Sequence, residues 1–298
     1  MNSKEKGFLL LTGQLGVPER KILTPAQLRS LSDRVRSMVK PSEDRDLDLT
    51  DLLALGYREE MARRILGLLD EEDLLEHYLE RGKKLGCVPL TRVSPGYPRI
   101  LKAGLGTDAP GCLWAKGDMT LLEGPKVALV GSRDILPQNR EFAEEAGRQA
   151  AHQDFVLVSG NARGADRAAQ EACLRAGGRV ISVVADRLAK QPAREGMLYL
   201  SQDGFDEEFS SQRALSRNRV IHALGLCVFV AQCGCQTGGT WDGTVKNLRF
   251  RWSLVRCFDD GSPSMKLLEQ MGAELIGMKA LSDIGALTTG ERTLYDLL

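Results

Sequence analysis

The chain reads Val-Ala-Leu-Val-Gly-Ser-Arg at residues 127–133, where a continuous apolar run stops at a glycine, a hydroxyl and a guanidinium. Similar apolar runs follow it, at Phe155–Val158, Val180–Val184, Leu226–Val230, Ser253–Val255 and Glu274–Ile276. Helical patterns lie between them, at Arg140–His152, Arg163–Ala176, Ala214–Leu224 and Thr244–Arg249. Continuous apolar strands that alternate with helices are typical of a parallel sheet covered on both faces. We therefore predict an α/β fold, a doubly wound parallel sheet with helices on both faces.

The residues before this core divide into two parts. Residues 1–86 predict a small all-helical domain, because amphipathic patterns recur there. These patterns lie at Thr24–Val39, Arg58–Leu69 and Glu71–Leu85. The polar segment Pro41–Asp48 predicts a loop between them. Residues 87–125 are rich in proline and predict a connector, with short strands at Cys87–Leu90 and Cys112–Ala115. The α/β domain takes residues 126–298, and its last predicted helix is Glu291–Leu298.

Composition limits the class of protein. Of 298 residues, 43% are hydrophobic and 27% charged, which excludes wholesale disorder and a coiled-coil rod. No apolar run approaches the ~20 residues that span a bilayer, and no signal peptide is evident. We therefore expect a soluble, cytoplasmic protein without membrane association. The net charge is zero, yet residues 213–256 hold seven basic side chains and one acidic one. That local excess favours a specific polyanion site over non-specific attraction.

The cysteines do not predict a metal centre. There are seven, in a chain with no export signal, so reduced thiols are expected. Cys233 and Cys235 form a close pair, but none of the three histidines lies within ten residues of it. A zinc site needs a second pair or nearby histidines. We predict no metal and no cofactor.

Four polar or glycine-rich segments follow predicted strands, at the sheet edge where such folds bind ligands. Their candidate phosphate-binding residues are Gly131, Ser132, Arg133, Ser159, Gly160, Arg163, Gly164, Arg217, Asn218, Arg219, Gly238, Gly239, Thr240 and Trp241. Glycines let backbone amides approach an anion, helix N-termini attract it, and arginine matches phosphate geometry. Neither G-x-G-x-x-G nor the P-loop pattern is present.

Each segment also has a structural interpretation. The Gly-Ser-Arg tripeptide would serve as a plain turn, and Asp166 would cap a helix in its first turn. The arginines would form ion pairs with acids at the sheet edge, such as Asp166 and Asp186, or lie on a solvated helix face. Trp241 would either stack on a base or fill the core.

Together, the order and spacing of these segments resemble the DprA/Smf family, the DNA-processing protein A of bacteria. The resemblance rests on Tyr-Pro at 97–98, the segment from Pro110 to Asp118, Val-Ala-Leu-Val-Gly-Ser-Arg at 127–133, Ser-Gly-x-Ala-Arg-Gly at 159–164 and Arg-Asn-Arg at 217–219. The sequence departs from the family pattern after Gly-Ser-Arg, where Asp134 to Pro137 replace the usual Thr-x-Tyr-Gly.

The resemblance implies a Rossmann-like core preceded by a helical domain of the SAM or helix-hairpin-helix kind. It implies single-stranded DNA binding at the strand ends by the candidate residues above, without catalysis. It also implies a homodimer that loads a RecA-type recombinase onto DNA, in recombination or DNA-mediated transformation.

Two other functions remain open. Proteins of the related lysine-decarboxylase-like (LOG) family are phosphoribohydrolases that use a Gly-Gly-x-Gly-Thr-x-x-Glu motif. This chain has Asn247 where that carboxylate is needed, and an amide does not supply a charge or accept a proton at neutral pH. The other alternative is a sensor that binds a nucleotide derivative without turnover, for example in phage defence.

Overall fold

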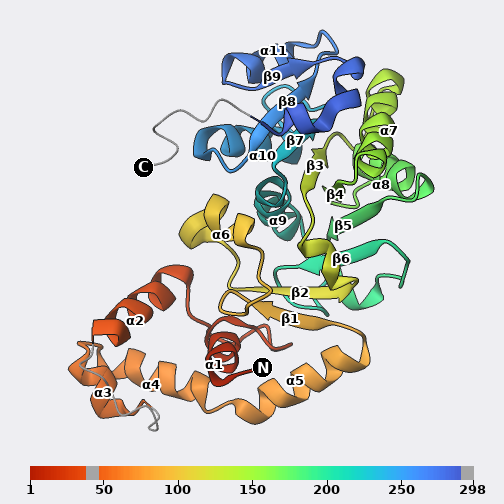
Figure 1. Cartoon of the computed structure of the whole chain (residues 1–298). Helices are drawn as coiled ribbons and strands as arrows, with labels where there is room; N and C mark the ends of the chain where they lie inside the picture. Colours follow the sequence, from red (N-terminus) through yellow and green to blue (C-terminus); the bar gives the residue numbers. More distant parts are fainter. Residues whose placement is uncertain (38–46, 290–298) are drawn as a thin grey trace.

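The computed structural model of the chain describes residues 1–37 and 47–289. Within them a nine-stranded sheet has helices on both faces and a helical module at one end (Figure 1). Its strands are β1 (Val88–Thr91), β2 (Cys112–Gly117), β3 (Lys126–Val130), β4 (Val156–Ser159), β5 (Arg179–Val183), β6 (Met197–Ser201), β7 (Cys227–Val230), β8 (Leu254–Phe258) and β9 (Glu274–Ile276). The predicted α/β class is confirmed. The predicted helix Glu291–Leu298 and most of the predicted loop Pro41–Asp48 lie outside the described residues.

The strands are ordered β1-β2-β6-β5-β4-β3-β7-β8-β9 across the sheet. From β6 to β9 all neighbours are parallel, whereas β2 pairs antiparallel with both β1 and β6. The chain builds outward from β3 in one direction as far as β6, then returns and builds the other way from β7. The order therefore reverses between β3 and β7, and a crevice opens at such a point in a doubly wound sheet.

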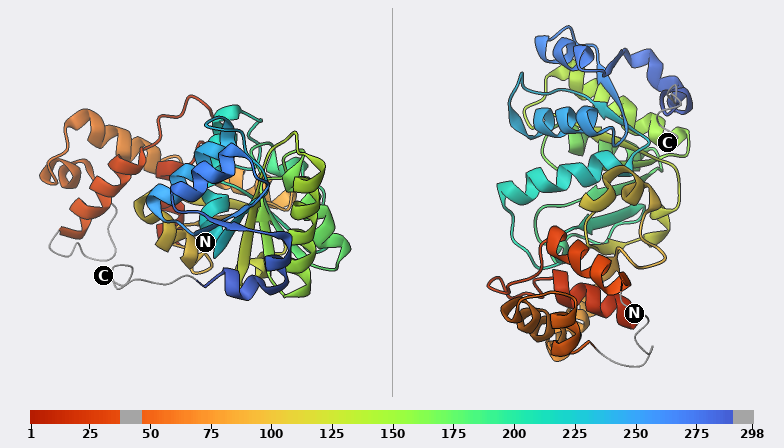
Figure 2. Two further views of the ribbon diagram at one scale, coloured as in Figure 1. Left: turned by 90° about the horizontal axis from the view of Figure 1, so that it is seen from above. Right: turned by 90° about the vertical axis from the view of Figure 1, so that its left-hand side faces the viewer.

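Successive residues of the central strands face opposite cores, which explains their continuous apolar sequences. In β3, Val127 and Leu129 pack on one face, and Ala128 and Val130 pack on the other. The first face carries α7 (Pro137–His152), α8 (Ala165–Arg175) and α12 (Ile284–Leu287). The second face carries α6 (Arg99–Leu105), α9 (Ser211–Leu224), α10 (Gly238–Phe250) and α11 (Pro263–Gln270), as the views in Figure 2 show. Short 3-10 helices are η1 (Gly106–Asp108), η2 (Met119–Leu122), η3 (Leu188–Lys190) and η4 (Met278–Asp283).

The helical module packs around its own apolar core. Its helices are α1 (Ser3–Thr12), α2 (Pro25–Ser37), α3 (Leu49–Ala54), α4 (Glu59–Leu69) and α5 (Glu72–Lys84). Leu52 and Ile65 are fully buried at its centre. Asn2 begins α1 with a capping box, a pattern that fixes a helix start.

An aromatic cluster joins the module to the sheet. The ring of Tyr78 in α5 stacks on Phe205 at 4.4 Å and meets the edge of Trp114 in β2 at 5.3 Å. The Tyr78 hydroxyl donates to the Asp206 carboxylate at 2.7 Å. Burial of three aromatic side chains at one contact fixes the module against the loop after β6, because each removes a large apolar area from water.

Candidate functional site

A pocket of about 390 Å³ lies at the carboxyl ends of β3 and β7, where the strand order reverses. The loops after these strands and the first turns of α9 and α10 line it. Eight of the predicted site residues lie on its wall: Gly131, Ser132, Arg133, Arg217, Asn218, Gly238, Gly239 and Thr240. Six do not: Ser159, Gly160, Arg163, Gly164, Arg219 and Trp241. The structure thus brings all four segments to one pocket, the second through Ala162 and Asp166 rather than through its predicted residues.

The loop after β4 lines the pocket through Ala162 and also packs closely against the loop after β3, at two glycines. Gly164 has φ +88°, and a Cβ there would lie 2.3 Å from the Ser132 carbonyl oxygen. A Cβ on Gly131 would lie 2.4 Å from the Cβ of Ala165, the first residue of α8. The two loops therefore touch backbone to backbone, and only glycine allows that approach. Gly164 supports the Ser132–Arg133 turn from behind.

Asp166 ties the same loop together from inside. Its carboxylate is buried and accepts hydrogen bonds from the backbone amides of Gly160 at 3.1 Å and Ala162 at 3.2 Å. Burial raises the pKa of Asp166 to about 6, against the opposing effect of the Arg217 charge. The carboxyl also lines the pocket. Asp166 therefore organises the loop after β4 and places an acidic group in the pocket wall.

Arg217 is buried, which its sequence context did not predict. Its Nη1 donates to the backbone carbonyl oxygens of Gly160 and Val183, at the ends of β4 and β5. A Cβ on Gly160 would lie 2.4 Å from this guanidinium, so the glycine provides its space. Burial lowers the pKa of Arg217, and the Asp166 charge opposes that effect. Because Arg217 also lines the pocket, it is a cation fixed in place by the sheet.

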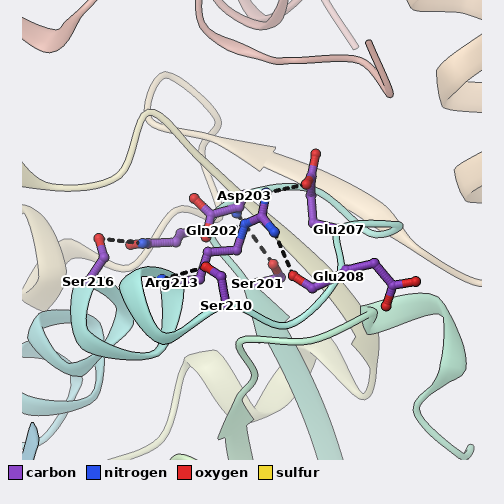
Figure 3. Close-up of polar contacts among 8 residues, drawn as sticks. All are labelled: Ser201, Gln202, Asp203, Glu207, Glu208, Ser210, Arg213 and Ser216. Atoms are coloured by element: carbon purple, nitrogen blue, oxygen red, sulfur yellow. Dashed lines mark hydrogen bonds and ion pairs between the residues drawn. The ribbon is translucent and has the colours of Figure 1, made fainter. Parts of the chain in front are cut away.

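A polar network before α9 sets the position of that helix (Figure 3). The Ser210 hydroxyl accepts a hydrogen bond from the Arg213 amide at 3.1 Å and caps α9. The Arg213 side chain pairs with Glu207, donates to the Glu208 carbonyl at 2.5 Å and lies 3.8 Å from the Asp203 carboxylate. Arg213 is therefore held by acids of the loop after β6.

The expected basic surface of residues 213–256 is partly neutralised. Arg213, Lys246 and Arg256 form ion pairs with Glu207, Asp242 and Glu274, respectively. Three of the seven cations counted in the sequence are thus paired with carboxylates. The excess of basic residues in this part of the sequence therefore does not form a single surface of unpaired cations.

The fourth segment is the first turn of α10, although the sequence pattern predicted a loop. The Thr240 hydroxyl donates to the Gly131 carbonyl at 3.0 Å, and the Asn218 amide donates to the Gly239 carbonyl at 3.1 Å. These bonds join the loop after β3 to α9 and α10. The backbone amides of a first helical turn have no partner within the helix, so this turn offers donors to an anion in the pocket.

The remaining three predicted residues lie elsewhere. Arg163 is exposed and pairs with Asp134 at 2.6 Å. Arg219 acts electrostatically on Tyr97 and Asp203, away from the pocket wall. Trp241 is partly buried and packs against the core beneath α10, which is the structural alternative considered for it.

In contrast, Arg133 is exposed, lines the pocket and has no ion pair within the residues that the structure describes.

Asn247, at the position where the phosphoribohydrolase motif requires a carboxylate, lies in a buried polar cluster. Its Oδ1 accepts from the Ser253 amide at 2.9 Å, and its Nδ2 donates to Nδ1 of His222 at 3.1 Å. His222 is fully buried, and burial lowers its pKa to about 4. Asn247 does not line the pocket. It serves as a contact between α9, α10 and the residue before β8 (Leu254–Phe258).

Asp166 and His222 contribute opposite pH dependence to stability. For Asp166 the folded-state pKa of about 6 exceeds the ordinary 3.8, so the folded protein holds a proton that the unfolded chain releases, and stability falls as pH rises through this range. For His222 the folded-state pKa of about 4 lies below the ordinary 6.5, so stability falls as pH drops below that value. Between about pH 7 and pH 5 each group contributes roughly 1–2 kcal/mol, with opposite sign.

We therefore expect the free energy of unfolding of Asp166→Asn to fall by about 1 kcal/mol more than that of wild type on acidification from about pH 7 to pH 5, because the His222 effect is then uncompensated. Urea denaturation at the two pH values measures the change. His222→Gln serves as the control and should reverse the sign of the difference. Identical pH profiles for all three proteins would contradict both assignments.

Among residues 1–37 and 47–289, no group of three or more His, Cys, Asp or Glu side chains could hold a metal ion. Cys233 lines the pocket and is buried, and burial raises its pKa to about 11, whereas Cys235 is exposed. In the same part of the chain, every helix is too short or too polar to cross a membrane.

A sequence profile of the family described as DNA recombination-mediator protein A matches residues 89–245. Two curated relatives are the DNA processing proteins DprA of Streptococcus pneumoniae and Bacillus subtilis, each 32% identical to this chain. The first alignment covers 57% of this chain and 64% of the relative, and the second covers 53% and 55%. The chain thus spans less than two thirds of the length of these relatives.

Among solved structures, the fold is similar to that of DNA processing protein A from Streptococcus pneumoniae, with a TM-score of 0.67 and 26% identity over 91% of this chain and 99% of that chain. It is also similar to the Helicobacter pylori protein reported for its single-stranded DNA binding mode, with a TM-score of 0.57 and 23% identity over 68% of this chain and 97% of that chain. The second likeness shows a shared fold only. The matched profile includes all four predicted site segments.

Proposed function

Because the chain belongs to the DNA recombination-mediator protein A family, we propose that it binds single-stranded DNA in the pocket between β3 and β7 and acts as a recombination mediator. The observation that carries the proposal is the combination of two guanidinium groups in this pocket. Arg217 is fixed by backbone carbonyls, and Arg133 is exposed without an ion pair among the described residues. The first turn of α10 adds backbone amide donors, which favour a phosphate.

The proposal divides the predicted site residues into two groups by their contacts. Those on the pocket wall contact the phosphates or the sugar directly. Gly160, Gly164 and Ser159 hold the wall in place, since they lie behind it. Arg163, Arg219 and Trp241 belong to the surroundings rather than to the pocket. We keep the division into a helical domain of residues 1–86, a connector of residues 87–125 and an α/β domain of residues 126–298, and assign the helical domain to the orientation of partners.

We further propose that the protein acts without turning over its ligand, as a homodimer that helps load a RecA-type recombinase. Two groups lining the pocket are unsuited to nucleophilic catalysis. The raised pKa of the Cys233 thiol keeps it protonated at neutral pH, and Asp166 is engaged by backbone amides. The buried Asn247 supplies no carboxylate for hydrolysis of a glycosidic bond.

Arg133→Ala should weaken the binding of labelled oligo-dT about tenfold and reduce the salt dependence by about one phosphate contact, because one guanidinium is lost from the pocket. Fluorescence anisotropy at two salt concentrations measures both effects. Arg163→Ala is a matched control: it removes an exposed arginine from the neighbouring loop, but outside the pocket and already paired with Asp134. Equal affinities for the two variants would reject this pocket as the DNA site.

The size of the pocket supports one alternative, a sensor of a nucleotide derivative. About 390 Å³ lies at the small end of the range for ligand pockets, which is roughly 300–1,000 Å³. Mononucleotides are therefore included as competitors in the same titration. Tight binding of a mononucleotide, with no strand binding by the wild-type protein, would favour the sensor function.

A further inference from the structure

A second, basic groove of about 510 Å³ lies between the helical module and the connector. Its walls come from α1, α2, the turn after β1, α6 and η1. Its apolar lining includes Phe8, Leu23 and Leu28. Its cationic side chains are Arg29, Arg36, Arg92 and Lys102. No Asp or Glu of the described residues lines it, so the groove is cationic in a chain whose net charge is zero.

Most of this charge is not neutralised within the described residues. Arg92 donates to the carbonyls of Gly106 at 2.7 Å and Thr107 at 3.2 Å, which hold the side chain but do not cancel its charge. The Lys102 ammonium lies 5.4 Å from the centre of the Tyr97 ring. Arg36 pairs with Asp33, whereas Arg29 has no hydrogen bond or ion pair among the described residues. A cleft lined by one sign of charge concentrates counter-ions.

The groove and the pocket are neighbours across α6 and α9. The two helices share a core through Leu101 and Val220, and Figure 1 shows α6 between α2 and α9. Arg219 of α9 acts electrostatically on Tyr97, as Arg92 of the groove does, and it also acts on the Asp203 carboxylate, so α9 carries a cation on the groove side with one acid beside it. Arg217, which lies about 200° around the same helix from Arg219, lines the pocket. A polyanion that leaves the pocket therefore meets cations on its way to the groove.

We propose that the groove between α2 and α6 binds a second segment of the DNA strand whose first segment occupies the pocket between β3 and β7. This inference rests on the proposed function. The phosphates contact Arg29 and Lys102, and the bases contact the apolar side chains of the lining. A single DNA strand that occupies both sites would contact the cation on α9 between the groove and the pocket. An acidic peptide bound in the groove alone would not need that cation, so we favour the DNA strand.

The test compares a short oligo-dT of about 6 nucleotides with one of about 20, since single-strand sites span roughly 4–16 nucleotides. Arg29→Ala combined with Lys102→Ala should bind the short strand as wild type does. It should bind the long strand about tenfold more weakly, with a salt slope smaller by about 1.4, because two phosphate contacts are lost. The matched control is Lys83→Ala with Lys84→Ala, which removes the same charge from an exposed turn of α5.

Each outcome separates the inference from the proposed function. Wild-type affinity of the groove variant for both strands, or equal losses in the control, overturns the inference and leaves the pocket site intact. Absence of strand binding by the wild-type protein overturns both. A glutamate-rich peptide that binds the wild type and not the groove variant, while the long strand binds both equally, assigns the groove to an acidic peptide and overturns the proposal.

Discussion

Arg217→Ala is expected to lower the free energy of unfolding by about 3–5 kcal/mol, the usual result of breaking a buried charged interaction from one side. The Gly160 and Val183 carbonyls lose their charged donor, and the Asp166 carboxylate loses a nearby positive charge. An unsatisfied buried group costs its full desolvation energy. Urea denaturation at neutral pH measures the loss. The effect exceeds that of any pocket residue whose side chain is exposed.

Arg219→Ala is the matched control, because Arg219 lies two residues further along α9 without a hydrogen bond or ion pair among the described residues. Arg219 is half-buried and its Nε has no partner among the described residues, so its loss should cost only about 1 kcal/mol, mainly through lost packing. Asp166→Asn should recover part of the loss when added to Arg217→Ala, since it removes the uncompensated carboxylate. Additive effects of the two substitutions would show that Asp166 and Arg217 are not coupled.

This result decides how binding data for α9 are interpreted. A double substitution of Arg217 and Arg219 would weaken DNA binding even if neither side chain contacted a phosphate, because the loops after β4 and β5 lose their shared anchor. Arg133 is the better reporter of contact, since it carries no structural hydrogen bond within the described residues.

Gly164→Ala is expected to destabilise the protein by about 4 kcal/mol, because strain at a disfavoured dihedral and a steric clash add together. The new Cβ would lie 2.3 Å from the Ser132 carbonyl oxygen and 2.5 Å from the Arg133 carbonyl oxygen. Backbone atoms cannot move aside as a flexible side chain does. The variant should also bind DNA more weakly, since the Ser132–Arg133 turn is displaced. Thermal unfolding and the oligo-dT titration measure the two effects.

The variant Gly238→Ala separates the cost of backbone strain from the cost of the steric clash. Its φ is +85°, close to that of Gly164, but no atom lies within 4 Å of the added Cβ. The control should therefore cost only the strain, about 1–2 kcal/mol. Similar losses for the two variants would mean that the contact between the two loops contributes nothing to stability.

The fold was predictable because its central strands are continuous apolar runs. The strand at Val127–Val130 and its neighbouring strands are buried on both faces of the sheet. Burial on both faces gives a continuous apolar sequence, which can be recognised without a structure. The strand Met197–Ser201 was missed, because no glycine-rich segment follows it to mark a strand end. Helix α10 begins at Gly238, earlier than predicted, since two glycines at a helix start look like a loop.

The site was predictable in outline but not in the role of each residue. Glycines and arginines after strands point to the edge where the pocket lies, yet three-dimensional contacts decide which arginine is buried. Arg217 is inside because Gly160, 57 positions earlier, leaves room for it. Arg213 is neutralised by Glu207, six positions away across a loop. The spacing of Arg217 and Arg219 could have shown that the two point to opposite sides of a helix.

The reversal of strand order also bears on how the chain folds. Ala128 of β3 pairs with Val158, 30 residues later, on one side, and with Val228, 100 residues later, on the other. Closing the longer loop costs more chain entropy, so the half from β3 to β6 is expected to assemble before β7 docks. The pocket exists only after both halves have met. Its appearance is therefore among the latest events of folding, and a bound strand would slow the first step of unfolding.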